Sequence, residues 1–447
     1  MKLASGMMGA WRYATAALLI GGWAMPATAA DLGGDCCADL EERVAELEAT
    51  TARKGNRKVS LTISGWVNEN VLWFDDGSES NTYVGTNPVE QSRFRFVGEA
   101  KITPDWSAGY VLEIGVWGGN STAWNQDNPD GSPSNNTLLV RKSSWYLKSS
   151  TYGKLTVGQD STATYHLLDD ADTTMTRNFY DAEGAPDYAR PFFLRDKSGG
   201  TIGSGAGLKW SDVLRGFTNS TPGDSGRRNI VRYDTPTFAG FSIATTWGED
   251  DMWDMALVYK NKFNDFDFNA RVGYGASGDG VGSACHGSTS SPDNAIDCEW
   301  WGVAAFVQHT PTGLYAYAGY GDQNDGSKNA AVNAALVDKD SRTWFIQGGI
   351  ENKWFALGKT NLFGEYRRDE AGSNVGISGT TGAPTLVTDG ANVDFWAVGA
   401  AQSIEAAQAT LYLVYQHVDG DVTLAGASTA TDIHALQQVI GGMKINF

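Results

Sequence analysis

Long apolar runs and charge are both scarce in this chain of 447 residues. Only 19% of its residues are charged, and beyond residue 30 no stretch approaches the roughly 18 apolar residues that a transmembrane helix requires. If such a chain crosses a membrane, it must do so as a β-barrel, because a closed barrel pairs all of its backbone groups.

Positive charge is also in deficit. The chain carries 52 acids against 34 bases, a formal charge of −18. Removal of residues 1–30, which hold two bases and no acid, leaves 52 acids against 32 bases, or −20. This balance argues against nucleic acid as a partner, because phosphate binding needs a basic surface. Prolines number 12, whereas glycines number 54 and aromatic residues make up 11%, which is typical of many short strands and turns.

Catalytic motifs are missing as well. The segment TIGSGAG lacks the glycine two positions before Ser204 that a nucleophile elbow requires, and SGDGVGS does not lie between a strand and a helix. The histidines show no metal-ligand spacing; they are His166, His286, His309, His417 and His434. The sequence therefore predicts no enzyme, no cofactor and no metal site.

The N-terminus has the pattern of a secretory signal over residues 1–30. Lys2 and Arg12 precede or flank the apolar core ATAALLIGGWAM, and small residues favour cleavage near Ala29 or Ala30. Residues 31–57 then predict a short periplasmic helix with apolar residues at a 3–4 spacing. This helix either packs alone on its own domain or helps three or more copies associate as a short coiled coil.

From Val59 onward the apolar period is two, which predicts β-strands. We expect sixteen, at 59–71, 93–102, 107–117, 138–148, 153–160, 228–235, 239–248, 253–260, 266–276, 299–309, 314–321, 342–352, 359–369, 391–403, 408–418 and 434–447.

The connections between these strands alternate in length. Every second one is a short turn such as TPD or TPTG, and the others are mostly long and polar. Outer-membrane barrels have short periplasmic turns, long outer loops and an even strand count. Aromatic residues also gather near both ends of the strands, as in two interface girdles. The prediction is an all-β protein: a 16-stranded antiparallel transmembrane β-barrel over residues 58–447.

Four cysteines remain after export. Cys285 and Cys298 share one polar segment, which predicts a loop-closing disulfide in an oxidising compartment; two free loop thiols are the alternative. Cys36 and Cys37 are adjacent and cannot easily pair with each other.

Four sequence blocks carry a resemblance to a known family. RKSSWYLKSSTYGKLTVGQDST and RNIVRYDTPTFAGFSIATTW resemble the Gram-negative trimeric porins. DCCADLEERVAELEATTARKGNRKVSLTISG and SRFRFVGEAKITPDWSAGYVLEIG resemble the alphaproteobacterial branch of that superfamily. The resemblance implies a homotrimer in the outer membrane of a Gram-negative bacterium that passes ions and small hydrophilic solutes. It also implies that residues 161–227 fold inward to narrow the pore.

A narrowed pore needs opposed charges on rigid supports. On the wall we expect Arg93, Arg95, Arg228 and Arg232, because an arginine in a barrel strand avoids lipid. On the loop we expect an acidic rim of Asp169, Asp170, Asp172, Asp181, Glu183 and Asp187. Many members of the resembled family carry an arginine after the glycine at the end of the fifth strand, whereas this chain has Gln159 after Gly158. Together with the acidic total, this departure predicts a weak preference for cations.

Two alternatives to a general diffusion pore remain open besides an enzyme. One is a substrate-specific channel for sugars or small organic ions, and the other is a soluble secreted β-domain.

The last strand ends on Phe447 and should pair with the first strand to close the barrel. In the resembled family such an ending is a signal for the barrel-assembly machinery, so outer-membrane lipid and that machinery are expected partners.

Overall fold

The structure is a computed structural model that describes residues 59–129, 131, 138–203, 207–214, 216, 221–248, 251–278, 296–327, 334–377 and 384–447. The expected signal peptide and N-terminal helix, with Cys36 and Cys37, lie outside the described residues, as does Cys285. Cys298 is buried on a strand of the barrel. No described helix is long and apolar enough to cross a membrane.

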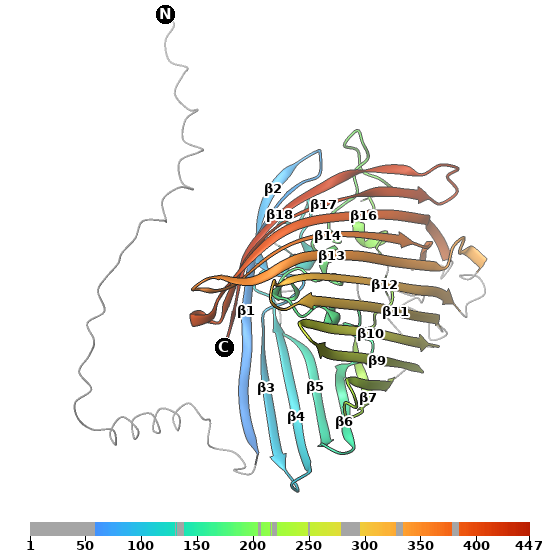
Figure 1. Ribbon diagram of the computed structural model, residues 1–447. Helices are drawn as coiled ribbons and strands as arrows, with labels where there is room; N and C mark the ends of the chain where they lie inside the picture. Colours follow the sequence, from blue (N-terminus) through green and yellow to red (C-terminus); the bar gives the residue numbers. More distant parts are fainter. Residues whose placement is uncertain are drawn as a thin grey trace, which may run out of the picture. The chain divides into compact units, whose positions relative to one another are not determined.

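Sixteen antiparallel strands, counted over the described ranges, pair in a closed ring (Figure 1). They are β1 (Ser60–Asp75), β3 (Arg93–Lys101), β4 (Trp106–Val116), β5 (Leu138–Ser149), β6 (Gly153–Ser161), β7 (Arg227–Asp234), β8 (Phe241–Gly248), β9 (Met252–Phe263), β10 (Phe266–Ser277), β11 (Ile296–His309), β12 (Leu314–Ser327), β13 (Asp340–Phe355), β14 (Gly358–Ala371), β16 (Pro384–Ile404), β17 (Ala409–Leu424) and β18 (Thr431–Asn446). The predicted sixteen-stranded barrel is confirmed.

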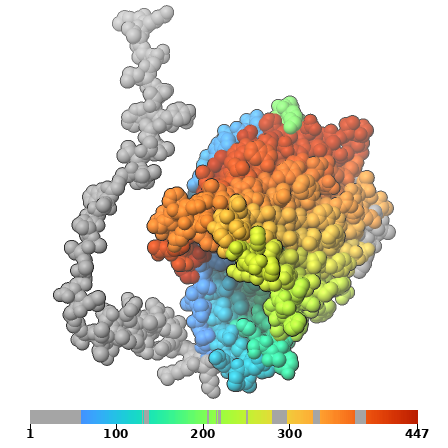
Figure 2. Space-filling model, viewed as in Figure 1, coloured from blue at the N-terminus to red at the C-terminus, as the bar shows by residue number. Residues whose placement is uncertain are grey.

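Two short strands extend the wall and were not predicted. β2 (Ser80–Thr86) pairs with the second half of β1, and β15 (Asn374–Ile377) pairs with the beginning of β16. Both belong to the long connections. Consecutive strands lie side by side around the barrel, as the continuous run of colours in Figure 2 shows.

The ring closes between the first and last strands, as predicted. Trp66 of β1 lies opposite Asn446 of β18, and the register continues to Asp75 opposite Gln437. Beyond β18, the Phe447 N–H donates to the Gly65 carbonyl at 3.0 Å, and the Gly65 N–H donates back at 3.0 Å. A Cβ on Gly65 would lie 2.3 Å from the Arg93 carbonyl oxygen, so a larger residue does not fit at this seam.

The two faces of the wall differ in chemistry. Along β13, Trp344 and Ile346 are exposed on the outside, whereas Thr343, Phe345 and Gln347 point inward and are buried. Exposed apolar residues recur on the outer face of most strands, for example Leu112, Ile243, Val303, Leu362, Val398 and Leu413. This alternation is that of a barrel with an apolar outside and a polar inside.

Part of the interior is filled by the connection between β6 and β7, residues 162–226, called the inner loop below. Its described part lays Phe179, Tyr180 and Phe192 into one apolar cluster with inward residues of the far strands, including Phe363 and Tyr412. The Phe179 and Tyr412 rings stack with centroids 4.7 Å apart. The inner loop therefore packs against one side of the barrel interior.

Candidate functional site

The inner loop is fixed at its start by a buried carboxylate. Asp254 on β9 is fully buried and accepts hydrogen bonds from the backbone N–H groups of Ala163 (3.1 Å) and Thr164 (2.8 Å). The Thr164 hydroxyl donates to the same carboxylate at 2.6 Å. Asp254 thus turns the chain from the end of β6 into the barrel interior.

The middle of the inner loop is held by side chains of the far wall. Arg367 on β14 is fully buried, forms an ion pair with Asp369 at 2.6 Å, and donates to the Ala182 carbonyl oxygen. Glu351 on β13 accepts from the Met175 N–H at 2.8 Å. These anchors keep the loop on the β11–β18 side and leave the space beside β3–β10 open.

That open space is a cavity of about 660 Å³, called the channel cavity below. Among the described residues that line it, nine are cationic: Arg93, Arg95, Arg141, Lys142, Arg177, Arg227, Arg232, Lys260 and Arg271. Four are acidic: Glu90, Glu113, Asp170 and Asp234. The lining thus carries an excess of five positive charges, without counting His166.

Three of these arginines surround one carboxylate. Glu113 on β4 is fully buried and contacts Arg141 at 2.9 Å, Arg93 at 3.5 Å, and Arg95. Arg93 forms a second ion pair with Glu90 at 3.1 Å. Because two carboxylates serve three guanidinium groups, the cluster keeps positive charge toward the lumen.

Arg141 and Lys142 reach the lumen together because of a bulge in β5. The register shifts here: Glu113 lies opposite Lys142, but Ile114 lies opposite Val140, so Arg141 has no partner across the strand pair. Strict alternation would have turned one of the two outward. Neither residue was predicted to line the pore, because the RK dipeptide gives no sign of the bulge.

The predicted wall residues fall into two groups. Arg93, Arg95 and Arg232 line the channel cavity, whereas Arg228 is not among its lining residues. Gln159 differs from the prediction. It lies opposite Ser143 and Asn229, which are exposed on the outer face, and its amide donates to the Val140 carbonyl oxygen at 3.2 Å.

The physical reason is the alternation along β6. Thr156 and Asp160 are buried and line a further cavity of about 450 Å³. Gln159, one position before Asp160, therefore belongs to the opposite face.

The predicted acidic residues of the inner loop also separate. Asp170 lines the channel cavity and forms an ion pair with Arg271 at 2.8 Å. Asp181, Glu183 and Asp187 line a neighbouring cavity of about 210 Å³, called the side cavity below. Asp172 is buried and accepts from the Thr174 N–H at 2.8 Å. Most of these acids therefore hold the loop together instead of forming a rim on the channel cavity.

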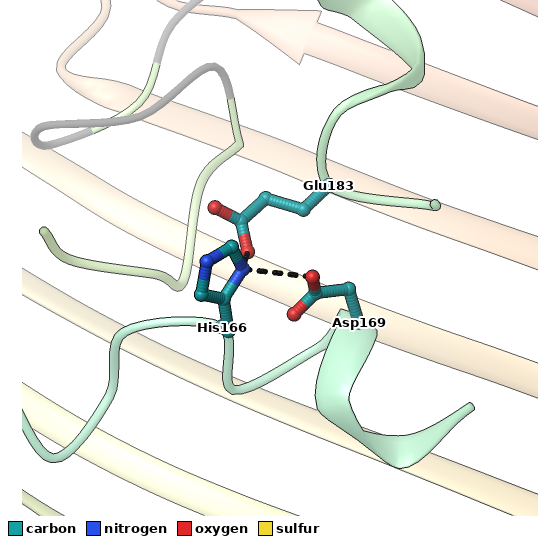
Figure 3. Close-up of side chains that lie close together, drawn as sticks. All are labelled: His166, Asp169 and Glu183. Atoms are coloured by element: carbon teal, nitrogen blue, oxygen red, sulfur yellow. Dashed lines mark hydrogen bonds and ion pairs between the residues drawn. The ribbon is translucent and has the colours of Figure 1, made fainter. Parts of the chain in front are cut away.

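The sixth predicted acid, Asp169, belongs to a cluster that was not predicted from the sequence (Figure 3). His166 Nδ1 lies 2.7 Å from Asp169 Oδ2 and 3.0 Å from Glu183 Oε2. Among the described residues these three form a group whose side-chain atoms could hold a metal ion. Their separations of 3 and 14 positions lie in an irregular loop, where no periodic pattern predicts a contact.

The pKa values in this part of the loop are strongly perturbed. Burial opposes the charged form of His166, but the carboxylates of Asp169 and Glu183 outweigh it and raise its pKa well above the ordinary value. Burial raises the pKa values of the Asp181 and Asp224 carboxyls well above their usual range. The pKa of Asp169 is lowered despite burial, because Arg177 and His166 lie beside it.

Comparisons with known proteins agree with this architecture. The family described as Gram-negative porin matches residues 14–256, more than half of the chain. The anion-selective porin from Comamonas acidovorans has 15% identity and a TM-score of 0.55, covering 87% of this chain and 100% of that one.

Two further solved structures have a similar fold. The trimer form of OmpT from Vibrio cholerae has 14% identity and a TM-score of 0.50, covering 87% of this chain and 99% of that one. OmpF of Salmonella typhi in complex with daunomycin has 13% identity and a TM-score of 0.50, covering 87% and 98%. No curated protein sequence matches the chain. At these identities the structural likeness shows the fold alone.

Proposed function

Because the chain belongs to the Gram-negative porin family, and hence to the bacterial outer membrane, we propose that it forms a water-filled channel for passive diffusion of ions and small hydrophilic solutes. The lumen between the inner loop and β3–β10 is the proposed route. The loop, held by Asp254 and Arg367, is the proposed constriction.

We further propose that the channel prefers anions. The observation that carries this proposal is the lining of the channel cavity, where nine cationic side chains face four acids. The weak cation preference expected from the acidic total is the opposite prediction. The lining argues against it, because ions in a narrow pore respond to charges on the wall more than to the total of the chain.

A preference for small organic anions is a second candidate, favoured by the cluster of Arg93, Arg95 and Arg141 around Glu113. Planar guanidinium groups bind carboxylates and phosphates through two parallel hydrogen bonds. A sugar-specific channel gains no comparable support from these side chains.

Several expectations about assembly remain proposals. We propose that the mature chain begins after residue 30, works as a homotrimer, and is read through Phe447 by the barrel-assembly machinery. We also propose a helix within residues 31–57 and a disulfide between Cys285 and Cys298. One structural neighbour is described as a trimer form, which supports the proposed trimer without testing it.

A planar bilayer in a KCl gradient tests the selectivity. We expect the reversal potential of the native channel to be shifted from zero toward the chloride equilibrium potential. Arg141→Gln should shift it toward zero, and Lys353→Gln, an exposed residue of the Lys353–Glu405 pair, serves as the matched control. A native reversal potential on the potassium side would reject the anion preference and restore the cation prediction. Block of the chloride current by millimolar succinate, but not by glucose, would support the second candidate.

A further inference from the structure

The side chains of His166, Asp169 and Glu183 converge on one point between two arms of the inner loop (Figure 3). We propose that this point is a binding site for a divalent transition metal ion, with Zn²⁺ as the representative. The ion would be bound by His166 Nδ1, Asp169 Oδ2 and Glu183 Oε2. It would cross-link the start of the loop to its middle, independently of the proposed function in diffusion.

The donor atoms have the chemistry and spacing that such an ion requires. Zn²⁺ accepts imidazole nitrogen and carboxylate oxygen at about 2.0–2.2 Å in tetrahedral geometry, which places ligand atoms roughly 3.3 Å apart. Nδ1 already lies 2.7 Å and 3.0 Å from the two oxygens, and all three atoms lie within 4.8 Å of one another. Small side-chain shifts would therefore admit the ion. A neutral imidazole with two carboxylates would also balance its charge.

An unsatisfied buried oxygen of Asp169 gives an independent reason for a cation here. Asp169 is fully buried, and its second oxygen, Oδ1, receives no hydrogen bond. Asp224 is also fully buried; its Oδ1 accepts from the N–H groups of Leu167 (3.0 Å) and Leu168 (3.3 Å). This contact places Asp224 beside the His166 segment, where its side chain is hydrogen-bonded to Glu183. Buried carboxylate oxygens require a donor or a cation, and a divalent ion supplies positive charge at this point.

The site is accessible from the lumen. His166 lines both the channel cavity and the side cavity, and Glu183 lines the side cavity, so an ion in the channel can reach them. His166 has φ of 59°, an uncommon conformation for a residue other than glycine. Arg177 Nη2 lies 3.3 Å from Asp169 Oδ2, so a bound metal ion would share this carboxylate with Arg177.

Equilibrium dialysis of the detergent-purified, EDTA-treated protein against Zn²⁺ tests the proposal. We expect about one Zn²⁺ per chain at micromolar concentration, with the affinity reduced at least tenfold in His166→Gln and in Glu183→Gln. His309→Gln is the matched control, because His309 is a half-buried histidine beside a turn, away from the inner loop; this variant should bind as the native chain does. Heat-modifiable migration confirms that each variant is folded.

Cobalt provides a second readout. Co²⁺ bound to the native protein should show visible absorption of a tetrahedral site, which disappears in Glu183→Gln even if His166→Gln fails to assemble. Absence of tight Zn²⁺ binding by the native chain, or binding that both loop variants retain, would overturn the proposal. Neither result depends on conductance, so failure here is distinguishable from failure of the proposed channel function.

Discussion

At the scale of single residues, Glu113 is a buried carboxylate at the centre of the charged channel wall. It is fully buried and serves as counterion to Arg93, Arg95 and Arg141. Removing one partner of a buried charge network is costly, because the remaining charges stay buried without compensation.

Glu113→Gln should therefore have two effects. We expect a loss of about 3–5 kcal/mol in the free energy of unfolding, and a stronger preference for chloride, since three guanidinium groups lose their shared carboxylate. Denaturant unfolding measures the first and the reversal potential the second. Glu405→Gln, at an exposed turn, is the control and should change both little. Unchanged selectivity in Glu113→Gln would show that the arginine cluster does not govern ion passage.

At the scale of elements, the inner loop depends on Asp254. The carboxylate accepts two backbone N–H groups and one hydroxyl, so Asp254→Asn presents an amide donor where acceptors are needed. Hydrogen bonds to a charged group contribute about 1.5–3 kcal/mol each, and we expect the start of the loop to loosen.

Single-channel recording of Asp254→Asn should show a larger and noisier open current than the native channel, with the barrel still formed. Asp265→Asn, in an exposed turn after β9, gives the comparison for an aspartate without such contacts. A quiet current of native size from Asp254→Asn would mean that Arg367, Glu351 and the apolar cluster fix the loop without Asp254.

The strands were predictable because lipid on one side and water on the other impose a period of two. The predicted strands are too short where the contrast between a lipid face and a water face ends. β12 was expected over 314–321 but extends to Ser327, through the polar stretch GDQNDGS that pairs with β11 and β13. Both faces of this extension carry polar residues, so no alternation of apolar and polar residues predicts the strand there.

The site was predictable only where it lies on regular strands. Arg93, Arg95 and Arg232 followed from alternation, and the bulge at Arg141 hid two further cations. In the irregular inner loop, the acids that face the lumen and the acids that hold the loop are the same residue types, so the sequence does not distinguish them. The His166 cluster depends on how that loop packs, which one sequence does not encode as a pattern.

At the scale of the whole molecule, the total charge and the channel charge have opposite signs. The chain carries −18, whereas the described lining of the channel cavity carries an excess of five cations. Buried acids such as Asp181 and Asp224, whose pKa values burial raises, add less negative charge than a formal count assigns.

Ionic strength should therefore modulate selectivity. The screening length falls from about 10 Å in 0.1 M salt to about 3 Å in 1 M salt. We expect the chloride-to-potassium permeability ratio to decline over this range and to decline less in Arg141→Gln. A ratio independent of salt would indicate that pore width, and not wall charge, sets the preference.

Closure of the barrel involves both the backbone and the ring of Phe447, and two variants separate their roles. Its backbone forms two 3.0 Å hydrogen bonds with Gly65, while its ring is 61% exposed on the outside. Phe447→Ala keeps the backbone bonds and removes the ring, whereas deletion of Phe447 removes both.

If the ring is the assembly signal, Phe447→Ala should lower the amount of folded barrel in the outer membrane almost as much as the deletion. The barrels that do assemble should retain native conductance, since the ring lies outside the lumen. Quantification of heat-modifiable protein in outer-membrane fractions measures the first effect, and bilayer recording measures the second. Phe355→Ala, an exposed aromatic at the end of β13, controls for loss of an interface ring. Normal assembly of Phe447→Ala with failure of the deletion would assign the role to backbone pairing at the seam.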